Sequence, residues 1–303
     1  MKAPELKADS LLRRANALRL SSKIISDGIR AGAFRSVYRG RGIEFSGVRE
    51  YLRGDDVRSI DWNVTARMGK TFVKQFEEDR ELILFLVVDA SLSMQTGSSQ
   101  KSRLYSALEI AALTAFAATH TNSPVGCVVF AKDILFGVEP KASHDQVLLL
   151  LSHFDNVLKS SYADKVERNT GSALGKALKG TAKMLKKRSL VLVISDFRTT
   201  GYEKPLAVLC TKHDVVAVRI TDSCDLELPE IGTVPFVDAE SGFVQRFPTN
   251  AASFRREWRE EGRQRLERWR GICSRRGAVP LEISTDEDVA QKLQQFFSLK
   301  ELK

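Results

Sequence analysis

The chain has 303 residues, of which 43% are hydrophobic and 28% are charged. This composition supports a substantial folded core and excludes an intrinsically disordered chain. The 47 Lys and Arg residues exceed the 38 Asp and Glu residues, which gives a net charge of +9. A surplus of this size permits an acidic partner, although a mixed, solvated surface explains it as well.

The cysteines and the N-terminus indicate the compartment. The four cysteines, at positions 127, 210, 224 and 273, form no C-x-x-C pair, so neither a disulfide scaffold nor a structural zinc site is predicted. The first 20 residues lack a continuous apolar core and carry Glu5 and Asp9, which argues against a signal or transit peptide. The longest apolar run, Leu82 to Val88, is far shorter than the roughly 20 residues of a membrane-spanning helix. We therefore expect a cytoplasmic protein without a transmembrane segment.

Two segments precede the main domain. Residues 1–37 have leucine and alanine at helical spacing among lysine and arginine, which predicts an N-terminal helical extension. Residues 38–80 are polar and dense in charge, and we expect this segment to pack on the core. Residues 81–303 alternate short apolar runs with helical patterns and are expected to form the main domain.

The main domain begins with a strand–helix alternation. Residues 82–88, 189–196 and 214–221 read as strands buried on both faces, as in a parallel sheet. Residues 124–138 predict two strands around a turn at Lys132 and Asp133. Helical patterns follow the first strand and recur near 143–158 and 171–187. The alternation predicts an α/β fold with a doubly wound, mainly parallel sheet and helices on both faces.

The C-terminal part carries an expected insertion near 222–277. Residues 222–247 predict a loop with a small hairpin, and residues 250–276 a strongly basic helix. Residues 280–284 predict a last strand, and a last helix is expected to start at Asp286 and end near Phe297.

The candidate functional residues follow the first buried strand. Asp89, Ser91 and Ser93 form a D-x-S-x-S pattern, and Asp196 follows a second buried strand. Ligands of open α/β sheets bind beyond the carboxyl ends of the strands. A carboxylate and two hydroxyls on one tight loop are hard oxygen ligands, suited to Mg²⁺ or Mn²⁺. The structural alternative is that the two serines only cap the next turn or helix.

This pattern resembles the metal-ion-dependent adhesion site of the von Willebrand factor A domain, a Rossmann-like fold. The resemblance implies a further ligand from a threonine in a later loop, here residues 168–174. Arg168 stands at the first threonine position of that loop, and Thr170 follows two residues later. An arginine is a permanent cation, so Arg168 either repels a metal or replaces it by pairing with Asp89 or Asp196.

The charged segment has a second, longer pattern. By chemistry alone, its arginines and carboxylates predict ion pairs that lock the segment in place, with a binding role as the alternative. The pattern closely resembles the signature of the bacterial family called domain of unknown function 58. It is carried by Gly42, Glu44, Phe45, Val48, Arg49, Tyr51, Gly54, Asp55, Asp56, Val57, Arg58, Ile60, Asp61, Trp62, Asn63, Val64, Thr65, Ala66 and Arg67.

The family resemblance implies a function. Such proteins accompany AAA+ ATPases of the MoxR type and are thought to act as chaperone-like adaptors that mature or assemble client proteins. ATP hydrolysis then belongs to the partner, and this chain is not an enzyme. Many members carry two N-terminal transmembrane helices, so this chain resembles the short soluble branch.

Two other functions compete with the adaptor. Residues 255–276 combine nine arginines with two tryptophans, which suits nucleic acid or an anionic surface. Interleaved glutamates such as Glu261, four residues before Arg265, favour instead a salt-bridged helix docked on the core. A metal-dependent hydrolase is the third hypothesis, but it needs a general base, and only Asp196 is available.

Overall fold

The computed structural model describes residues 25–26, 44–77, 82–98, 101–163, 173–237 and 243–298. The chain divides into two compact units: Arg35–Glu81, and Met1–Phe34 together with Leu82–Lys303. Each unit is described by itself.

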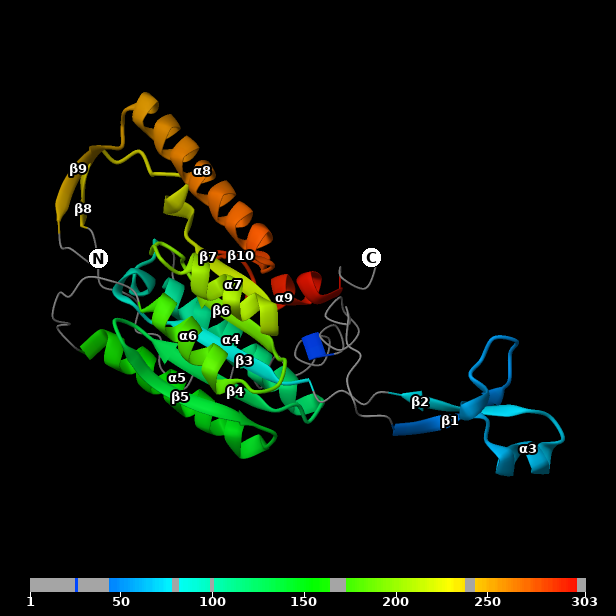
Figure 1. Cartoon of the computed structure of the whole chain (residues 1–303). Helices are drawn as coiled ribbons and strands as arrows, with labels where there is room; N and C mark the ends of the chain where they lie inside the picture. The colour runs from blue at the N-terminus through cyan, green and yellow to red at the C-terminus, as the bar shows by residue number, and fades with distance from the viewer. Residues whose placement is uncertain are drawn as a thin grey trace. The chain divides into compact units, whose positions relative to one another are not determined.

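The larger unit contains a six-stranded sheet in the order β10-β7-β6-β3-β4-β5 (Figure 1). The strands are β3 (Leu84–Asp89), β4 (Val125–Phe130), β5 (Ile134–Lys141), β6 (Leu190–Ser195), β7 (Asp214–Thr221) and β10 (Val279–Ser284). All neighbours pair in parallel except β4 and the edge strand β5. The chain builds outward from β3 to β5 and then returns to β6 on the other side of β3. The strand order therefore reverses between β3 and β6, and the predicted doubly wound sheet is confirmed.

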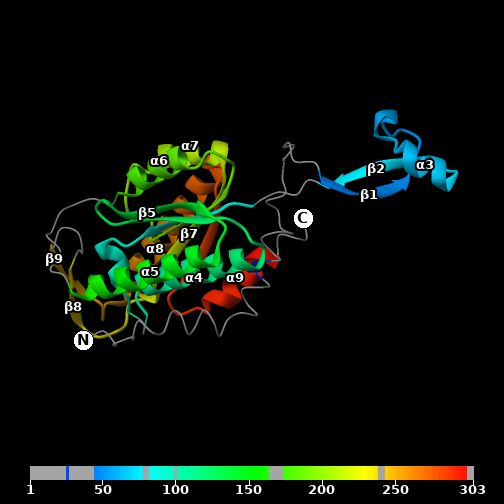
Figure 2. The ribbon, with the colours of Figure 1, turned by 90° about the horizontal axis from the view of Figure 1, so that it is seen from below.

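Helices cover both faces of this sheet (Figure 2). One face carries α4 (Arg103–His120), α5 (His144–Ala163) and α9 (Val289–Ser298), and the other carries α6 (Leu174–Met184), α7 (Glu203–Lys212) and α8 (Ala252–Arg276). α7 is a helix that the sequence patterns did not predict. It has only ten residues and contains Pro205, which is tolerated because it lies in the first turn.

Strand alternation builds two cores. Leu84, Leu86 and Val88 of β3 belong to the cluster under α4, α5 and α9, whereas Phe85 and Val87 belong to the cluster under α6, α7 and α8. Successive side chains of a strand point to opposite faces, so a strand covered on both sides is apolar at every position. This accounts for the continuous apolar run in the sequence.

The predicted insertion has the expected elements. Residues 233–237 and 244–248 form the antiparallel hairpin of β8 (Thr233–Val237) and β9 (Val244–Pro248), and the basic helix is α8. Phe236 and Phe247 of the hairpin contact Phe254 and Trp258 of α8, with ring centroids 5.2–5.8 Å apart between hairpin and helix. Farther along α8, Trp269 is buried against the sheet. The predicted docking of this helix on the core is therefore observed around Trp269, while its first turns pack on the hairpin.

Most of the predicted N-terminal extension, residues 1–37, lies outside the described residues. The exceptions are Ile25 and Ser26, which are helical and buried. Ile25 belongs to the same apolar cluster as α4. In the part of the chain that the structure describes, no helix is both long and apolar enough to cross a membrane.

The smaller unit has regular structure that its composition did not predict. β1 (Glu44–Glu50) and β2 (Phe72–Glu77) form an antiparallel hairpin, and the connection between them contains the short helices η2 (Val57–Ser59) and α3 (Trp62–Met68). The packing of this segment on the core stays a prediction.

Candidate functional site

The two predicted aspartates lie at the point where the strand order reverses. Asp89 is the last residue of β3, and Asp196 directly follows β6, the neighbouring parallel strand. Both residues are buried: the exposed fraction is 1% for Asp89 and 3% for Asp196. In an open α/β sheet this is the position at which ligands bind.

Asp89 accepts hydrogen bonds from the loop after its own strand and from the neighbouring strand β6. The backbone N–H of Ser91 donates to Asp89 Oδ1 at 2.9 Å, and Ser195 Oγ donates to Oδ2 at 2.6 Å. Burial, and then the nearby charge of Asp196, raise the pKa of Asp89 from 3.8 to about 7 against the effect of these hydrogen bonds. A buried carboxyl with a carboxylate neighbour is poorly stabilised in its ionised form.

The two serine hydroxyls of the D-x-S-x-S loop lie beside each other, with 3.2 Å between Ser91 Oγ and Ser93 Oγ. Ser91 is the N-cap residue of η3 (Leu92–Gln95), yet its side chain makes no capping hydrogen bond. α4 is capped instead by Ser102, whose side chain accepts a hydrogen bond from the Tyr105 N–H at 3.1 Å. The Ser91 side chain therefore caps neither η3 nor α4, and both hydroxyls keep oxygen lone pairs for another partner.

Asp196 has one satisfied and one unsatisfied oxygen. Its Oδ1 accepts a hydrogen bond from the Arg198 N–H at 3.1 Å. Its Oδ2 is buried and accepts no hydrogen bond within the described residues, and the Nε of Arg198 lies 3.8 Å away. A buried carboxylate oxygen without a donor is costly, so this atom marks a position where a positively charged group would stabilise the protein.

The backbone after Asp196 adopts a conformation that is rare for a residue with a side chain. Phe197 has a φ of 51° in the left-handed region. Its N–H donates to Ser195 Oγ at 3.0 Å, and its ring packs against Tyr202 and Trp269 at centroid distances of 5.4 and 5.6 Å. These contacts offset a backbone strain of about 1–3 kcal/mol and fix the turn that carries Asp196.

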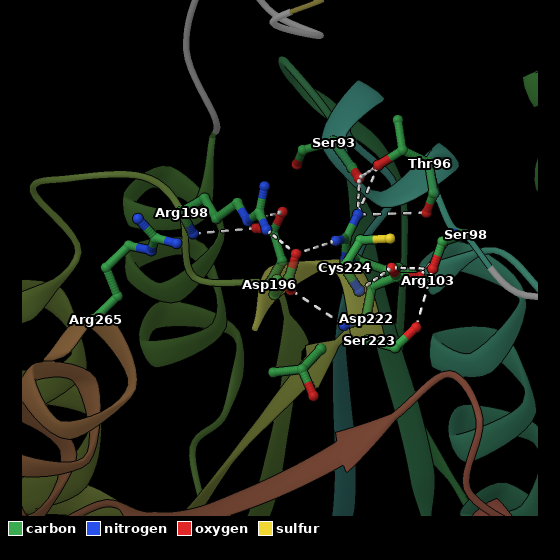
Figure 3. A network of polar contacts seen from close by, with 12 residues as sticks. Ser93, Thr96, Ser98, Arg103, Asp196, Arg198, Asp222, Ser223, Cys224 and Arg265 are labelled. Atoms are coloured by element: carbon green, nitrogen blue, oxygen red, sulfur yellow. Dashed lines mark hydrogen bonds and ion pairs between the residues drawn. The ribbon is translucent and has the colours of Figure 1, made fainter. Parts of the chain in front are cut away.

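An ion-pair network connects this loop with two other loops of the sheet edge (Figure 3). Asp225 accepts from Arg103 Nη2 at 2.6 Å and also pairs with Arg198. Arg103 is 4% exposed and donates to Thr96 Oγ1 at 2.6 Å in the loop after η3. The network therefore ties the loop after β3 to the loops after β6 and β7.

Asp222 provides a second tie. It caps η4 (Ser223–Asp225) by accepting from the Cys224 N–H, and it also accepts from the backbone N–H of Ser98 at 2.8 Å and from Thr285 Oγ1 at 3.2 Å. Desolvation opposes these hydrogen bonds, but their sum lowers the pKa of Asp222 and keeps it ionised. The loops around Asp89 and Asp196 are thus held by side chains, not by strand pairing.

The donor set fits a hard divalent cation. Asp89, Ser91, Ser93 and Asp196 supply only oxygen atoms, and one buried oxygen of Asp196 lacks a donor. The described residues contain no group of three or more His, Cys, Asp and Glu side chains that could hold a metal, so hydroxyls have to complete such a site. The other two predicted residues, Thr170 and Arg168, lie outside the described residues.

Sequence reasoning missed the arginines of the site. Arg198 stands two residues after Asp196, and this short separation could have indicated that the arginine belongs to the same site. Arg103 and Asp225 are 122 positions apart, and neither carries a local pattern that would have paired them.

Several residues of the long signature build the smaller unit itself. Arg49 donates to both oxygens of Asp55 at 2.7 and 2.8 Å, and this pair lowers the pKa of Asp55. Asp56 caps η2, and Asp61 caps α3 through the N–H groups of Asn63 and Val64. These contacts account for part of the signature as local structure.

Other signature residues remain accessible. Arg58, Trp62 and Arg67 are exposed, with 66% of Trp62 accessible, while Tyr51 is half-buried. Gly54 has a φ of 113°, which requires glycine. The exposed members are therefore the ones available to a partner.

Four of the nine arginines of α8 form ion pairs with separations of 2.8–3.5 Å. Arg255 pairs with Glu230, Arg259 with Glu227, Arg265 with Glu261 and Arg270 with Glu282. The pair of Arg265 and Glu261 has the spacing within the helix that the sequence indicated, whereas the other three pairs join α8 to residues outside it. This pairing gives no support to the nucleic-acid alternative, which stays untested.

Comparison with known proteins places these features in context. A family model described as "Protein of unknown function DUF58" matches residues 47–268. An uncharacterized protein of Mycobacterium bovis and one of Mycobacterium tuberculosis are each 30% identical over 275 residues, covering 89% of this chain and 84% of the relative. Among solved structures, the conserved hypothetical protein BatB from Bacteroides thetaiotaomicron has a TM-score of 0.44 at 15% identity, covering 73% of this chain and 100% of that chain. The VWA domain of SpRpn10 has a TM-score of 0.35 at 11% identity, covering 71% and 94%.

Proposed function

Because the chain belongs to the family of proteins of unknown function DUF58, we propose that it is a non-catalytic protein-binding module. Its binding surface is the adhesion rim, defined as Asp89, Ser91, Ser93 and Asp196, which holds Mg²⁺ or Mn²⁺ and receives a carboxylate of the partner. The observation that carries the proposal is the buried Asp196 Oδ2, which accepts no hydrogen bond in the described part of the chain.

The electrostatics of the rim support a cation. Two carboxyl groups are buried beside each other, and the pKa of Asp89 is raised to about 7 by burial and by Asp196. A divalent ion would neutralise the pair and reverse this shift, because a nearby cation favours the ionised form. Asp89, Ser91, Ser93 and Asp196 would hold the ion, with Thr170 as the proposed further ligand. The ion would supply an electrophilic position for a partner's carboxylate.

The hydrogen bonding of the rim supports a binding role over hydrolysis. The hydroxyl of Ser195 and the backbone N–H of Ser91 donate to Asp89, and the backbone N–H of Arg198 donates to Asp196, whose second oxygen lies 3.8 Å from Arg198 Nε. A hydrolase needs a general base close to the reacting water. Both aspartates are instead assigned here to holding the ion.

Metal binding is the first test. We expect Mg²⁺ and Mn²⁺ to bind the full chain with one-to-one stoichiometry in isothermal titration calorimetry at pH 8. Asp89→Asn should weaken binding at least tenfold, because it removes a charged ligand. Asp286→Asn is the matched control, since Asp286 is exposed and the same charge is lost away from the rim. Equal affinities for Asp89→Asn and the unchanged protein would refute the metal site.

Arg168 offers an alternative to the metal. If its guanidinium occupies the rim, the unchanged chain binds Mg²⁺ weakly and Arg168→Ala binds it more tightly. The same titration with this variant therefore distinguishes a metal-bearing rim from an arginine-filled one.

The identity of the partner is the second test. The family resemblance supports a MoxR-type AAA+ ATPase, with a client protein that the pair matures or assembles. We expect the full chain to retain this ATPase from source-cell lysate in Mg²⁺, and to lose it in EDTA and with Asp89→Asn. Retention of the ATPase under all three conditions would mean that the contact lies outside the adhesion rim. Capture of no ATPase with any variant would refute the partnership.

A further inference from the structure

A second polar site lies next to the adhesion rim. Arg198, Arg219 and Arg265 line a small pocket between the ends of β7 and β10 and the middle of α8, together with Asp225 and Glu282. We call this site the arginine pocket, after its three arginines. Figure 3 shows Arg198 and Arg265 on the same side of Asp196.

Arg219 is the unusual member of the arginine pocket. It extends from β7 and is only 7% exposed. Its Nε has no hydrogen-bond acceptor in the described part of the chain, and its Nη1 makes one long bond of 3.4 Å to the backbone oxygen of Arg265. Its guanidinium lies over the ring of Trp269 at 5.5 Å, which provides some cation–π stabilisation.

The acidic residues of the pocket are already paired with other arginines. Asp225 accepts from Arg103 and Arg198, and Glu282 accepts from Arg270 Nη2 at 2.8 Å. No ion pair at Arg219 is found among the described residues. Its pKa is lowered chiefly by burial and then by the neighbouring charge of Arg198, while the charges of Asp225, Asp196 and Glu282 oppose this shift. A buried cation with no directly paired carboxylate is stabilised further when an anion joins it.

Size and charge limit the ligand. The volume of the pocket is about 20 Å³, which admits one water-sized group. A nucleotide base or a sugar is therefore too large, whereas one oxygen of a compact oxyanion enters and the others stay at the mouth. Arg198 and Arg265 are partly exposed there, with 45% and 39% of their side chains accessible. Three arginines match a group with three acceptor oxygens better than a carboxylate with two.

We propose that the arginine pocket binds a phosphoryl group, with Arg219 at its floor and Arg198 and Arg265 at its mouth. The group comes either from free phosphate or from a phosphorylated side chain of a partner protein. The three arginines are not residues of the adhesion rim, but Arg198 Nε also lies 3.8 Å from Asp196 Oδ2. The binding of the phosphoryl group is therefore proposed, and tested, without a metal ion.

Inorganic phosphate titrated into the full chain in EDTA at low ionic strength tests the proposal. We expect saturable binding at one site, measured by calorimetry and by the change in tryptophan fluorescence, since Trp258 lies beside Arg265 and Trp269 beside Arg219. Arg219→Gln is the direct variant, but Arg219 is buried and its loss can impair folding. Arg265→Gln keeps the backbone oxygen that Arg219 contacts and should weaken phosphate binding about tenfold or more, because a charge-assisted hydrogen bond is lost.

The matched control is Arg263→Gln. Arg263 is exposed on the same helix and does not line the pocket, so the variant removes the same charge without the contact. We expect its affinity for phosphate to stay within about twofold of the unchanged protein, since a distant surface charge is screened. Equal losses in both arginine variants, or no saturable phosphate binding, would overturn the proposal.

Titrations with two further ligands identify the source of the bound phosphoryl group and test whether the pocket selects it. A phosphoserine peptide that binds at least tenfold more tightly than phosphate assigns the site to a phosphorylated partner, and the opposite order assigns it to the free ion. Acetate that binds as tightly as phosphate would show that the pocket does not select phosphoryl groups and would overturn the proposal. Because all titrations are made in EDTA, their outcome is separate from that of the metal titration at the rim.

Discussion

Asp89→Asn should raise the free energy of unfolding above pH 7 in EDTA by up to about 4 kcal/mol and leave it almost unchanged near pH 4. The reason is the pKa of Asp89, which burial and Asp196 raise from 3.8 to about 7 in the folded protein. A shift of about three units corresponds to about 4 kcal/mol. Asparagine keeps the size of the side chain and the acceptor for the Ser91 N–H but carries no charge.

The sign of the effect follows from proton binding. Between pH 3.8 and about 7 the folded protein keeps the proton of Asp89, whereas the unfolded chain has lost it. The folded state binds more protons, so the stability contributed by this group is present below pH 3.8 and falls as the pH rises to about 7. The asparagine variant lacks this loss of stability. The free energies of unfolding of the two proteins therefore diverge as the pH rises from 3.8 to about 7.

Thermal unfolding in EDTA from pH 4 to pH 8 measures the divergence. A difference of 4 kcal/mol corresponds to about 10 °C in Tm for a domain of this size. Asp286→Asn should follow the unchanged protein at every pH, because its side chain is exposed. A Tm of Asp89→Asn below that of the unchanged protein at pH 8 in EDTA would contradict this account of the rim. Saturating Mg²⁺ should reduce the difference in Tm between Asp89→Asn and the unchanged protein, since it stabilises chiefly the unchanged protein, which binds it more tightly.

The sheet was predictable because its signal is local. Each buried strand is a short apolar run, such as Leu190–Ser195, and the helices between strands have their own periodicity. The positions of Asp89 and Asp196 followed from the same reasoning, since both residues end such runs. The two residues come together only because β3 and β6 are neighbours, and the sequence left that neighbourhood open until the structure gave the order of the strands.

The contacts around the site were not predictable from local pattern. Arg103 and Asp225 form a buried ion pair across 122 residues, and Asp222 joins the N–H of Ser98 across 124. Nothing in the spacing of these residues distinguishes them from surface charges, because their partners are chosen by the tertiary fold. The hairpin of the smaller unit was missed for a different reason. Its strand β1 reads EFSGVRE, in which charges and glycine hide the alternation.

Gly262→Ala should lower the free energy of unfolding by about 2–3 kcal/mol, although alanine is the better helix former. Gly262 lies on α8 where the helix crosses the loop after β7. A Cβ at this position would lie 2.6 Å from the backbone oxygen of Asp225 and 2.9 Å from Leu226 Cδ2. Backbone cannot yield as a flexible side chain does, so the helix and the loop have to separate.

Gly271→Ala is the matched control on the same helix. Its Cβ would meet only the side chain of Arg275, at 3.2 Å from Nη1, and that side chain can move. This variant should therefore gain about 0.5–1 kcal/mol from helix propensity. Urea unfolding measured by tryptophan fluorescence compares the two variants, and equal effects on the free energy of unfolding would refute the close approach at Gly262.

The two glycines also connect stability with binding. Asp225 and Arg265 stand on opposite sides of the contact at Gly262, and both line the arginine pocket. Separating helix from loop would move Arg265 away from Arg219, so Gly262→Ala should weaken phosphate binding at temperatures where the protein is still folded. Gly271→Ala should not, because it leaves this crossing in place. If a folded Gly262→Ala variant still bound phosphate as the unchanged protein does, the arginine pocket would not depend on the contact between α8 and the loop after β7.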